Sequence, residues 1–205
     1  MDVQEFREII ARGREWPSVE FKRGGSRQDR RLLTQVARAM IGMANRRDGG
    51  RVIIGVDEDE NRLPLPDGLS DEDLATWSYD DLANSLAEYT DPSVSFDLET
   101  VEYEDKKFVA LTVYEFQDMP VLCKKDYPDV LRAGACYVRT KRKPETAEIP
   151  TQADMRDLLD LAIEKGVRRF VTRARAAGLS LSGQLPPTDS ESFDRQVEDF
   201  LGEGK

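Results

Sequence analysis

The sequence contains no histidine and only two cysteines, Cys123 and Cys136, among its 205 residues. Without histidine, neither a mixed Cys/His zinc site nor a Ser-His or Cys-His nucleophilic pair can be built. Two cysteines are too few for a disulfide framework, so we expect buried thiols in a reducing compartment. Any acid–base chemistry must therefore come from Asp, Glu, Lys or Tyr side chains, or from a metal-bound water.

Long apolar runs are missing as well. No stretch reaches the roughly 20 apolar residues that a membrane-spanning helix needs, and the first residues, "MDVQEFREIIARG", lack the basic-then-apolar pattern of a secretion signal. The phosphate-binding motif G-x-x-x-x-G-K-[ST] is absent too. We therefore expect a cytoplasmic protein with no membrane partner and no nucleotide cofactor, and not a P-loop ATPase.

Charge is unevenly distributed along the chain. The formal net charge is −10, yet basic residues dominate from Arg12 to Arg51 and acidic residues from Asp57 to Asp105. A second basic cluster follows, made of Arg139, Lys141, Arg142 and Lys143. Such segregation is typical of a protein with one phosphate-binding face. It is equally typical of a highly charged, solvated surface.

The apolar periodicity predicts an α+β fold, with a mixed, mainly antiparallel sheet packed against helices. Helical spacing predicts helices over residues 2–12, from Asp29 to about residue 44, and over "YDDLANSLAEY". Alternation and β-branched residues predict strands at "SVEFK", "RVIIGV" and "ACYVRTKRK", and a hairpin in which "EDK" joins two strands. The acidic segment "DEDENRLPLPDGLSDED" between them is expected to be a loop.

The C-terminal part is expected to be organised differently. We predict a domain over residues 1–150, a helix that is amphipathic and then basic over 151–177, and a linker-like acidic tail over 178–205. Thr151 with Asp154 three residues later predicts a capping box at the start of this helix.

Two short motifs suggest a site. In "VEFK", strand alternation places Glu20 and Lys22 on one face, as in nucleases where a carboxylate binds a metal and a lysine stabilises charge. Asp57 follows the apolar strand "RVIIGV", where an acid is suited to hold Mg²⁺. The alternatives are a surface ion pair for Glu20 with Lys22 and a solvated loop for Asp57.

Tyr137 and Arg139 alternate on one face of a predicted strand, ahead of a basic segment. This arrangement suits an aromatic platform for an unpaired base beside cations for the phosphate backbone. A solubilising loop explains the same residues. For both cysteines, buried core positions are the expected role.

Together, "EWPSVEFK", the helix ending "MIGMANRRDGG", the strand "RVIIGVDED" and the later "GACYVRTKRKPETA" resemble the Schlafen AlbA-type domain. The resemblance covers about residues 14–147, in the family's order. It implies a Schlafen-like single lobe that binds nucleic acid. In animal Schlafens, a domain of this type is a metal-dependent endoribonuclease that cuts tRNA and rRNA.

By that resemblance, the implied catalytic residues are Glu15, Glu20, Asp57 and Lys22, and the three acids would bind Mg²⁺ or Mn²⁺. The residues expected to contact nucleic acid are Arg23, Arg31, Arg38, Tyr137, Arg139, Lys141, Arg142 and Lys143. The family's zinc site is absent, as the lack of histidine requires. A homodimer is a way to supply the second lobe that animal Schlafens carry in one chain.

Three functions remain open from the sequence. The first is a metal-dependent endonuclease that acts on RNA rather than DNA. The second is a non-catalytic DNA- or RNA-binding regulatory module. The third is a protein-interaction subunit of a regulatory or antiviral defence complex, with the acidic loop or tail as its docking segment.

Overall fold

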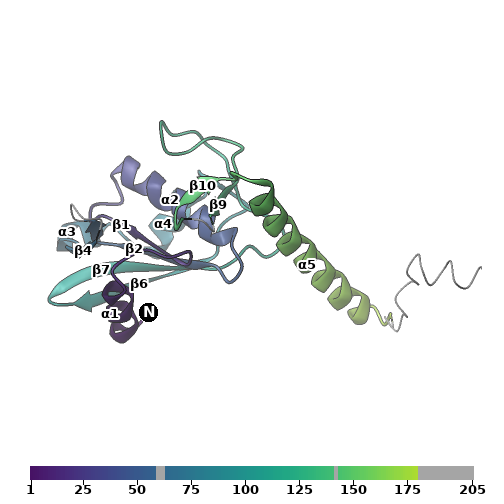
Figure 1. Ribbon diagram of the computed structural model, residues 1–205, viewed down its shortest axis with the longest axis horizontal. Helices are drawn as coiled ribbons and strands as arrows, with labels where there is room; N and C mark the ends of the chain where they lie inside the picture. Colours follow the sequence, from purple (N-terminus) through teal and green to yellow (C-terminus); the bar gives the residue numbers. More distant parts are fainter. Residues whose placement is uncertain (59–62, 141–142, 180–205) are drawn as a thin grey trace, which may run out of the picture. The chain divides into compact units, whose positions relative to one another are not determined.

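The computed structural model describes residues 1–58, 63–140 and 143–179 (Figure 1). Its elements follow one another as α1 (Val3–Ala11), β1 (Val19–Lys22), α2 (Arg30–Ala44), β2 (Gly50–Ile54), β3 (Val56–Glu58), β4 (Pro64–Pro66), α3 (Asp71–Leu74), α4 (Tyr79–Leu86), β5 (Thr90–Asp91), β6 (Phe96–Tyr103), β7 (Lys106–Val113), β8 (Leu122–Cys123), β9 (Tyr137–Arg139), β10 (Thr146–Glu148) and α5 (Gln152–Ala176). The α+β fold with a mainly antiparallel sheet and a C-terminal helix is thereby confirmed.

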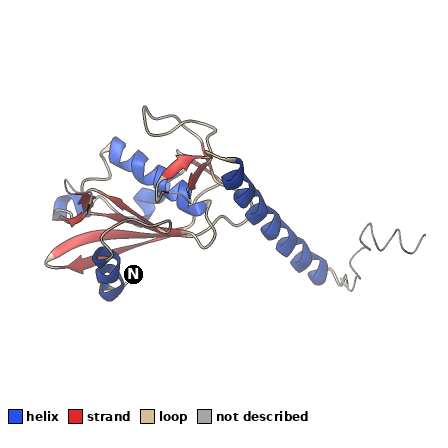
Figure 2. Cartoon of the chain, in the orientation of Figure 1, coloured by secondary structure: helices blue, strands red, loops and turns tan. Residues whose placement is uncertain are grey.

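The central sheet has the strand order β1-β2-β7-β6. β1 runs parallel to β2, whereas β2–β7 and β7–β6 are antiparallel. The long helix α2 and the short helix α1 lie on opposite faces of this sheet (Figures 1 and 2). The sheet therefore buries apolar side chains on both faces, which explains why β2 and β7 read as nearly continuous apolar runs.

Helix α2 starts where the sequence predicts it. The Asp29 carboxylate accepts hydrogen bonds from the backbone N–H groups of Arg31 and Leu32, which caps the first turn. The apolar side of α2 packs on Val52, Ile54 and other side chains of one sheet face. On the other face, Phe6 and Ile9 of α1 join a second apolar cluster with Val19, Phe21, Ile53 and Phe108.

The hairpin β6–β7 is also confirmed. Its turn residues Glu104 and Asp105 both have positive φ angles, 50° and 59°. Two consecutive positive φ values are characteristic of the tight turn that matches the twist of paired strands.

The predicted strand "RVIIGV" is interrupted at Gly55. This glycine has φ 106°, and a Cβ atom there would lie 2.9 Å from Leu69 Cδ1 and from Phe108 Cδ1. The chain therefore leaves the sheet after Ile54, and Val56–Glu58 pair with Pro64–Pro66 instead. The segment expected to be a loop thus contains β4 and the first residues of the short helix α3, and its residues 59–62 lie outside the described residues.

The small sheet β9–β10 packs on α2. A Cβ atom on Gly42 would lie only 2.7 Å from Thr146 Cγ2, so this close approach requires glycine. At the end of α2, the Asn45 side chain donates to the carbonyls of Val121 and Tyr137 and accepts from the Val121 N–H. These contacts fix β9 and β10 against the side of the sheet that α2 covers.

The chain divides into two units, Met1–Lys165 and Gly166–Lys205. The backbone N–H of Asp154 donates to the Thr151 hydroxyl at 3.1 Å, which confirms the predicted N-terminal cap of α5. Of the tail predicted over 178–205, residues 180–205 lie outside the described residues. Cys123 is buried, Cys136 is partly buried, and neither forms a disulfide.

No helix in the described ranges is long and apolar enough to cross a membrane.

Gly42→Ala should destabilise the domain even though alanine is the better helix former. The added methyl group would collide with Thr146, and overpacking of this kind costs typically about 1–3 kcal/mol, which outweighs the gain of up to about 1 kcal/mol in helix propensity. Thermal and urea unfolding of the purified variant would measure the difference.

Gly166→Ala is the matched control. Gly166 also lies within a helix, but a Cβ atom there has no other atom within 4 Å. This variant should be as stable as the wild type or more stable. Equal stabilisation by both substitutions would show that the Gly42–Thr146 contact is not tight.

Candidate functional site

Glu20 is the buried centre of the candidate site. Strand β1 directs Val19 and Phe21 into the apolar cluster on the α1 side and Glu20 to the opposite face, as predicted. One Glu20 oxygen accepts hydrogen bonds from Arg139 Nη1 at 2.6 Å and from the Thr146 hydroxyl at 2.7 Å. The other is paired with Lys22 Nζ. Both oxygens of this carboxylate are therefore occupied by donors of the protein itself.

Arg139, on β9, has a fully buried side chain. Besides Glu20, its guanidinium donates to the backbone carbonyls of Trp16 and Val19, each at 3.1 Å, and of Pro17 at 3.3 Å. A guanidinium carries five N–H donors in a fixed plane, and this one distributes them over the whole segment from Trp16 to Glu20. We refer to Glu15, Glu20, Lys22, Arg139 and Thr146 as the Arg139 cluster.

Glu15 is at the edge of this cluster. Its Oε1 accepts a hydrogen bond from the Phe21 N–H at 2.6 Å, and its Oε2 lies 3.7 Å from Arg139 Nη2. The turn at Pro17 brings Glu15 back beside β1, so both glutamates approach the same guanidinium. Of the three acids predicted to converge, Glu15 and Glu20 lie together with Arg139 as their common partner, and Lys22 is paired with Glu20.

The two glutamates differ in their protonation behaviour. Burial raises the pKa of Glu15, and repulsion from Glu20 adds to this, against the hydrogen bond from Phe21 and the nearby cations. Burial would also raise the pKa of Glu20, but attraction to Lys22 and Arg139 and the hydrogen bonds from Lys22 and Thr146 outweigh it. The pKa of Glu20 is therefore below its usual value, and this carboxylate remains ionised.

Asp57 is exposed on β3, beyond the interruption of the strand at Gly55. Within residues 1–58, 63–140 and 143–179, no three acidic or cysteine side chains are grouped so as to hold a metal ion. In addition, Lys22, Arg139 and Thr146 occupy the oxygens of Glu20 that a divalent cation would need. The arrangement described here does not fit Mg²⁺ or Mn²⁺, and the metal predicted from the resemblance stays a prediction.

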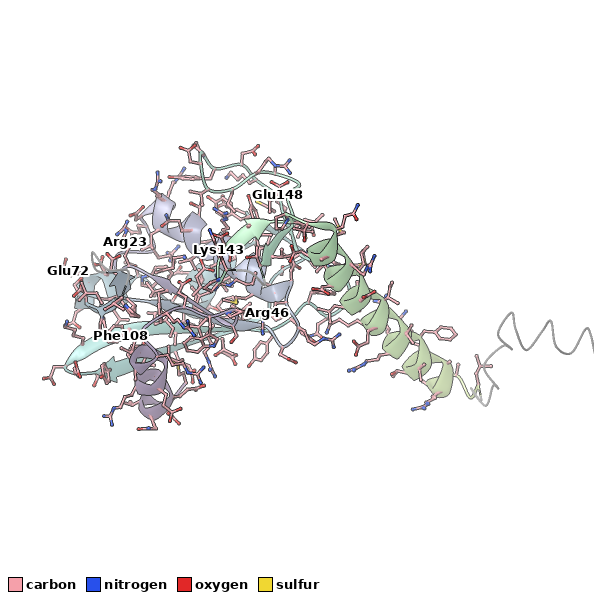
Figure 3. All side chains as sticks on the ribbon, in the orientation of Figure 1. Arg23, Arg46, Glu72, Phe108, Lys143 and Glu148 are labelled. Atoms are coloured by element: carbon pink, nitrogen blue, oxygen red, sulfur yellow. The ribbon has the colours of Figure 1, made fainter. Side chains whose placement is uncertain are left out.

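The predicted nucleic-acid contacts differ in how exposed they are. Arg31 and Lys143 are exposed, and Arg23 is exposed but paired with Asp29 at 2.5 Å (Figure 3 labels Arg23 and Lys143). Arg38 is partly buried, donates to the Thr146 carbonyl at 2.7 Å and lies over the Tyr137 ring. Lys141 and Arg142 lie outside the described residues.

Tyr137 and Arg139 have a structural role in place of the nucleic-acid contact that the sequence predicts for them. Tyr137 is 4% exposed and its hydroxyl accepts from the Arg132 N–H at 2.8 Å, so its ring is not available to stack on a base. Arg139 cannot reach a phosphate without leaving its buried partners. In this structure both residues hold the site together rather than contact a ligand: Tyr137 packs under Arg38 of α2, and Arg139 is enclosed by the segment Trp16–Glu20 and by Thr146.

Asn45 and Thr146 are two site residues that sequence reasoning missed. Asn45 fixes β9 to the end of α2, and Thr146 joins Glu20, Arg139 and Gly42. An asparagine at the end of an apolar helix is a recognisable cap signal. Thr146, within "PETAE", carries no comparable signal, since its role comes entirely from the pairing of β10 with β9.

These contacts define an α+β domain. A buried arginine from one of its last strands holds the glutamate motif near its N-terminus. Residues 15–148 match the model of the Schlafen, AlbA_2 family, and these bounds enclose the whole Arg139 cluster. The chain belongs to the Schlafen AlbA_2 family, which is a nucleic-acid-related family. No curated protein sequence matches the chain.

Several solved structures are similar to this chain, and two of them illustrate the match. The DIP2311 protein from Corynebacterium diphtheriae matches with a TM-score of 0.48 and 16% identity; the match covers 72% of this chain but only 26% of that protein. The N-terminal domain of a RecG-related protein from Nitrosomonas europaea matches with a TM-score of 0.47 and 18% identity, over 74% of this chain and 98% of that domain. Likenesses this distant carry no argument about function.

Glu20→Gln and Glu15→Gln should differ strongly in their effect on stability. Glutamine at position 20 removes the carboxylate that Arg139 and Lys22 contact directly, and removal of one partner of a buried ion pair costs about 3–5 kcal/mol. Glutamine at position 15 keeps an oxygen for the Phe21 N–H and removes a partly desolvated charge. Urea unfolding at pH 7 should therefore show a large loss for Glu20→Gln and little or no loss for Glu15→Gln.

The pH dependence distinguishes the two glutamates further. Glu20 has a lowered pKa, so its contribution to stability is present above the unfolded-state value near 4.5 and is lost as pH falls towards the folded-state pKa. Glu15 has a raised pKa, so stability is lost as pH rises from about 4.5 through its folded-state pKa. Relative to the wild type, Glu15→Gln should therefore gain stability over that rise. If the free energies of unfolding of the wild type and Glu15→Gln change with pH in parallel, the raised pKa of Glu15 is contradicted.

Proposed function

We propose that this domain binds nucleic acid through a cationic surface on α2 and the β9–β10 connection, and that it does so as a non-catalytic module. We define this α2 surface by Arg31, Arg38 and Lys143. Arg31, Gln35 and Arg38 are spaced four and three residues apart, so they lie along one side of α2. Arg38 reaches the carbonyl of Thr146, which is three residues from Lys143.

The observation that carries the proposal is that these cations are not neutralised by acids. In the described part of the chain, Arg31, Arg38 and Lys143 form no ion pair with a carboxylate, whereas Arg23 and Arg139 do. Arg38 Nε is buried and has no hydrogen-bond partner among the described atoms. Unpaired arginines and lysines on a protein of net charge −10 are suited to phosphate oxygens.

The surface between Arg139 and the first turns of α5 is less suited to a polyanion than the α2 surface is. A cleft of about 570 Å³ lies there, between Pro17, Arg139 and the first turns of α5. Although Arg46 and Arg47 line it, so do Asp48, Asp154, Asp157 and Asp160. Repulsion between these carboxylates and phosphate favours the α2 surface as the place of contact.

Replacing both Arg31 and Lys143 with Glu should weaken the binding of single-stranded RNA and DNA and reduce its salt dependence. Each lost phosphate contact lowers the slope of log affinity against log salt by about 0.7 for a single strand. Fluorescence anisotropy with a labelled oligonucleotide at several salt concentrations would measure both effects.

Arg7→Glu is the matched control, since Arg7 is exposed on α1, which covers the opposite face of the sheet. A single reversal there should change affinity much less than either single reversal on the α2 surface. If Arg7→Glu and Arg31→Glu weaken binding equally, overall charge rather than this surface determines the affinity.

A metal-dependent endoribonuclease is the second candidate function. The observation in its favour is that Glu15 and Glu20 approach one guanidinium, with a lysine on the same strand face. Against it stands the occupation of Glu20 by Lys22 and Arg139, one of which would have to withdraw before a carboxylate oxygen became available. Under this hypothesis, a homodimer supplies the second lobe for a structured RNA.

Glu15→Gln is the decisive variant for cleavage, because it is expected to leave the fold intact whereas Glu20→Gln is not. The proposal of a binding module predicts no Mn²⁺-dependent product from tRNA or single-stranded RNA with either the wild type or Glu15→Gln. A product formed by the wild type and lost in Glu15→Gln would establish the nuclease instead. Anisotropy on the same preparations would confirm that both proteins still bind RNA.

A further inference from the structure

Arg38 is held against the ring of Tyr137. Its Cζ atom lies over this ring, 5.2 Å from the centroid, and its Nη2 donates to the Thr146 carbonyl at 2.7 Å. Its Nε is buried and has no hydrogen-bond partner among the described residues. A side-on contact with a phosphate through Nε and Nη2 would therefore disrupt this packing. Arginine packs on aromatic rings through the plane of its guanidinium, which leaves the opposite face of the plane turned away from the ring.

The support beneath Arg38 is rigid. Tyr137 is buried, its hydroxyl accepts from the Arg132 N–H at 2.8 Å, and its carbonyl accepts from the Asn45 side chain at 2.9 Å. Thr146, which binds Nη2, belongs to the Arg139 cluster. Arg38 itself is only partly buried. Its guanidinium is thus positioned before any ligand arrives, which lowers the entropic cost of binding.

The exposed side of α2 is too narrow to read a duplex. A recognition helix needs a broad exposed face whose side chains reach base edges in the major groove. In α2, only four residues are exposed or partly exposed, and these are Arg30, Arg31, Gln35 and Arg38. Unpaired bases suit such a surface better, because they can be turned outwards and stacked on a flat side chain.

We propose that Arg38 is a stacking platform for an unpaired base, so that the ligand of the α2 surface is single-stranded nucleic acid. This inference rests on the nucleic-acid binding proposed above, and it assigns different tasks to two arginines of one helix. Arg31, about 10 Å further along the helix axis, meets the phosphate backbone as a charge, whereas Arg38 meets a base through its plane. Every base has a π face, so the contact tolerates any sequence.

Abasic strands separate stacking from charge. A thymidine oligonucleotide and a strand of equal length with abasic residues carry the same phosphates, but only the first has bases to stack. The wild type should bind the normal strand at least about fivefold more tightly at a fixed salt concentration. Fluorescence anisotropy with labelled strands measures both affinities. Equal affinities would overturn the proposal, and so would a duplex that competes as well as the single strand, phosphate for phosphate.

Arg38→Lys tests the residue itself, because lysine keeps the positive charge and removes the plane. The preference for the normal strand over the abasic strand should disappear. Arg31→Lys is the matched control on the same side of α2, and it should keep the ratio of the two affinities. A full preference retained by Arg38→Lys would show that Arg38 is not the platform. The abasic comparison on the wild type needs no variant, so it decides the question even if Arg38→Lys is less stable.

The outcomes separate this inference from the proposed function. Equal affinity for normal and abasic strands, together with weakened binding after reversal of Arg31 and Lys143, would refute the stacking platform and leave the cationic surface in place. A wild type that binds neither strand would refute the proposed function itself.

Discussion

The ion pair between Glu20 and Arg139 is the interaction on which the rest of this domain depends. Two charges taken out of water are costly, and their mutual attraction compensates only when all remaining donors and acceptors are also satisfied. Here Arg139 meets a carboxylate and three backbone carbonyls, and Glu20 meets a second cation and a hydroxyl. This complete set of partners fixes β1 to β9 and β10.

Most of the fold follows from local signals in the sequence. The Asp29 cap, the apolar side of α2 and the turn at Glu104–Asp105 are each encoded within a few residues, and each element is found where it is predicted. The interruption at Gly55 is different. It arises because Leu69 and Phe108 approach the backbone there, and neither contact is visible in the apolar pattern of the strand.

Only part of the site's membership, and none of its chemistry, was predictable from the sequence. That Glu15, Glu20 and Lys22 converge follows from strand alternation and from the turn at Pro17. Two nearby carboxylates, however, are equally suited to a divalent cation and to a guanidinium, and spacing along the chain does not say which is present. The decisive residue, Arg139, is far away in sequence, and its burial depends on the packing of β9 against the segment Trp16–Glu20. Tyr137, on the same strand, lies in the interior beneath Arg38 of α2.

The distance along the chain between Arg139 and Glu20 has a consequence for how the protein is made. The two residues are 119 positions apart, so during synthesis the N-terminal carboxylates leave the ribosome long before their guanidinium. Until then, the Glu20 carboxylate on β1 lacks its buried partner. Burial of this charge is unfavourable, so β1 is better solvated than packed against β2. The domain therefore completes its core only after β9 and β10 have emerged.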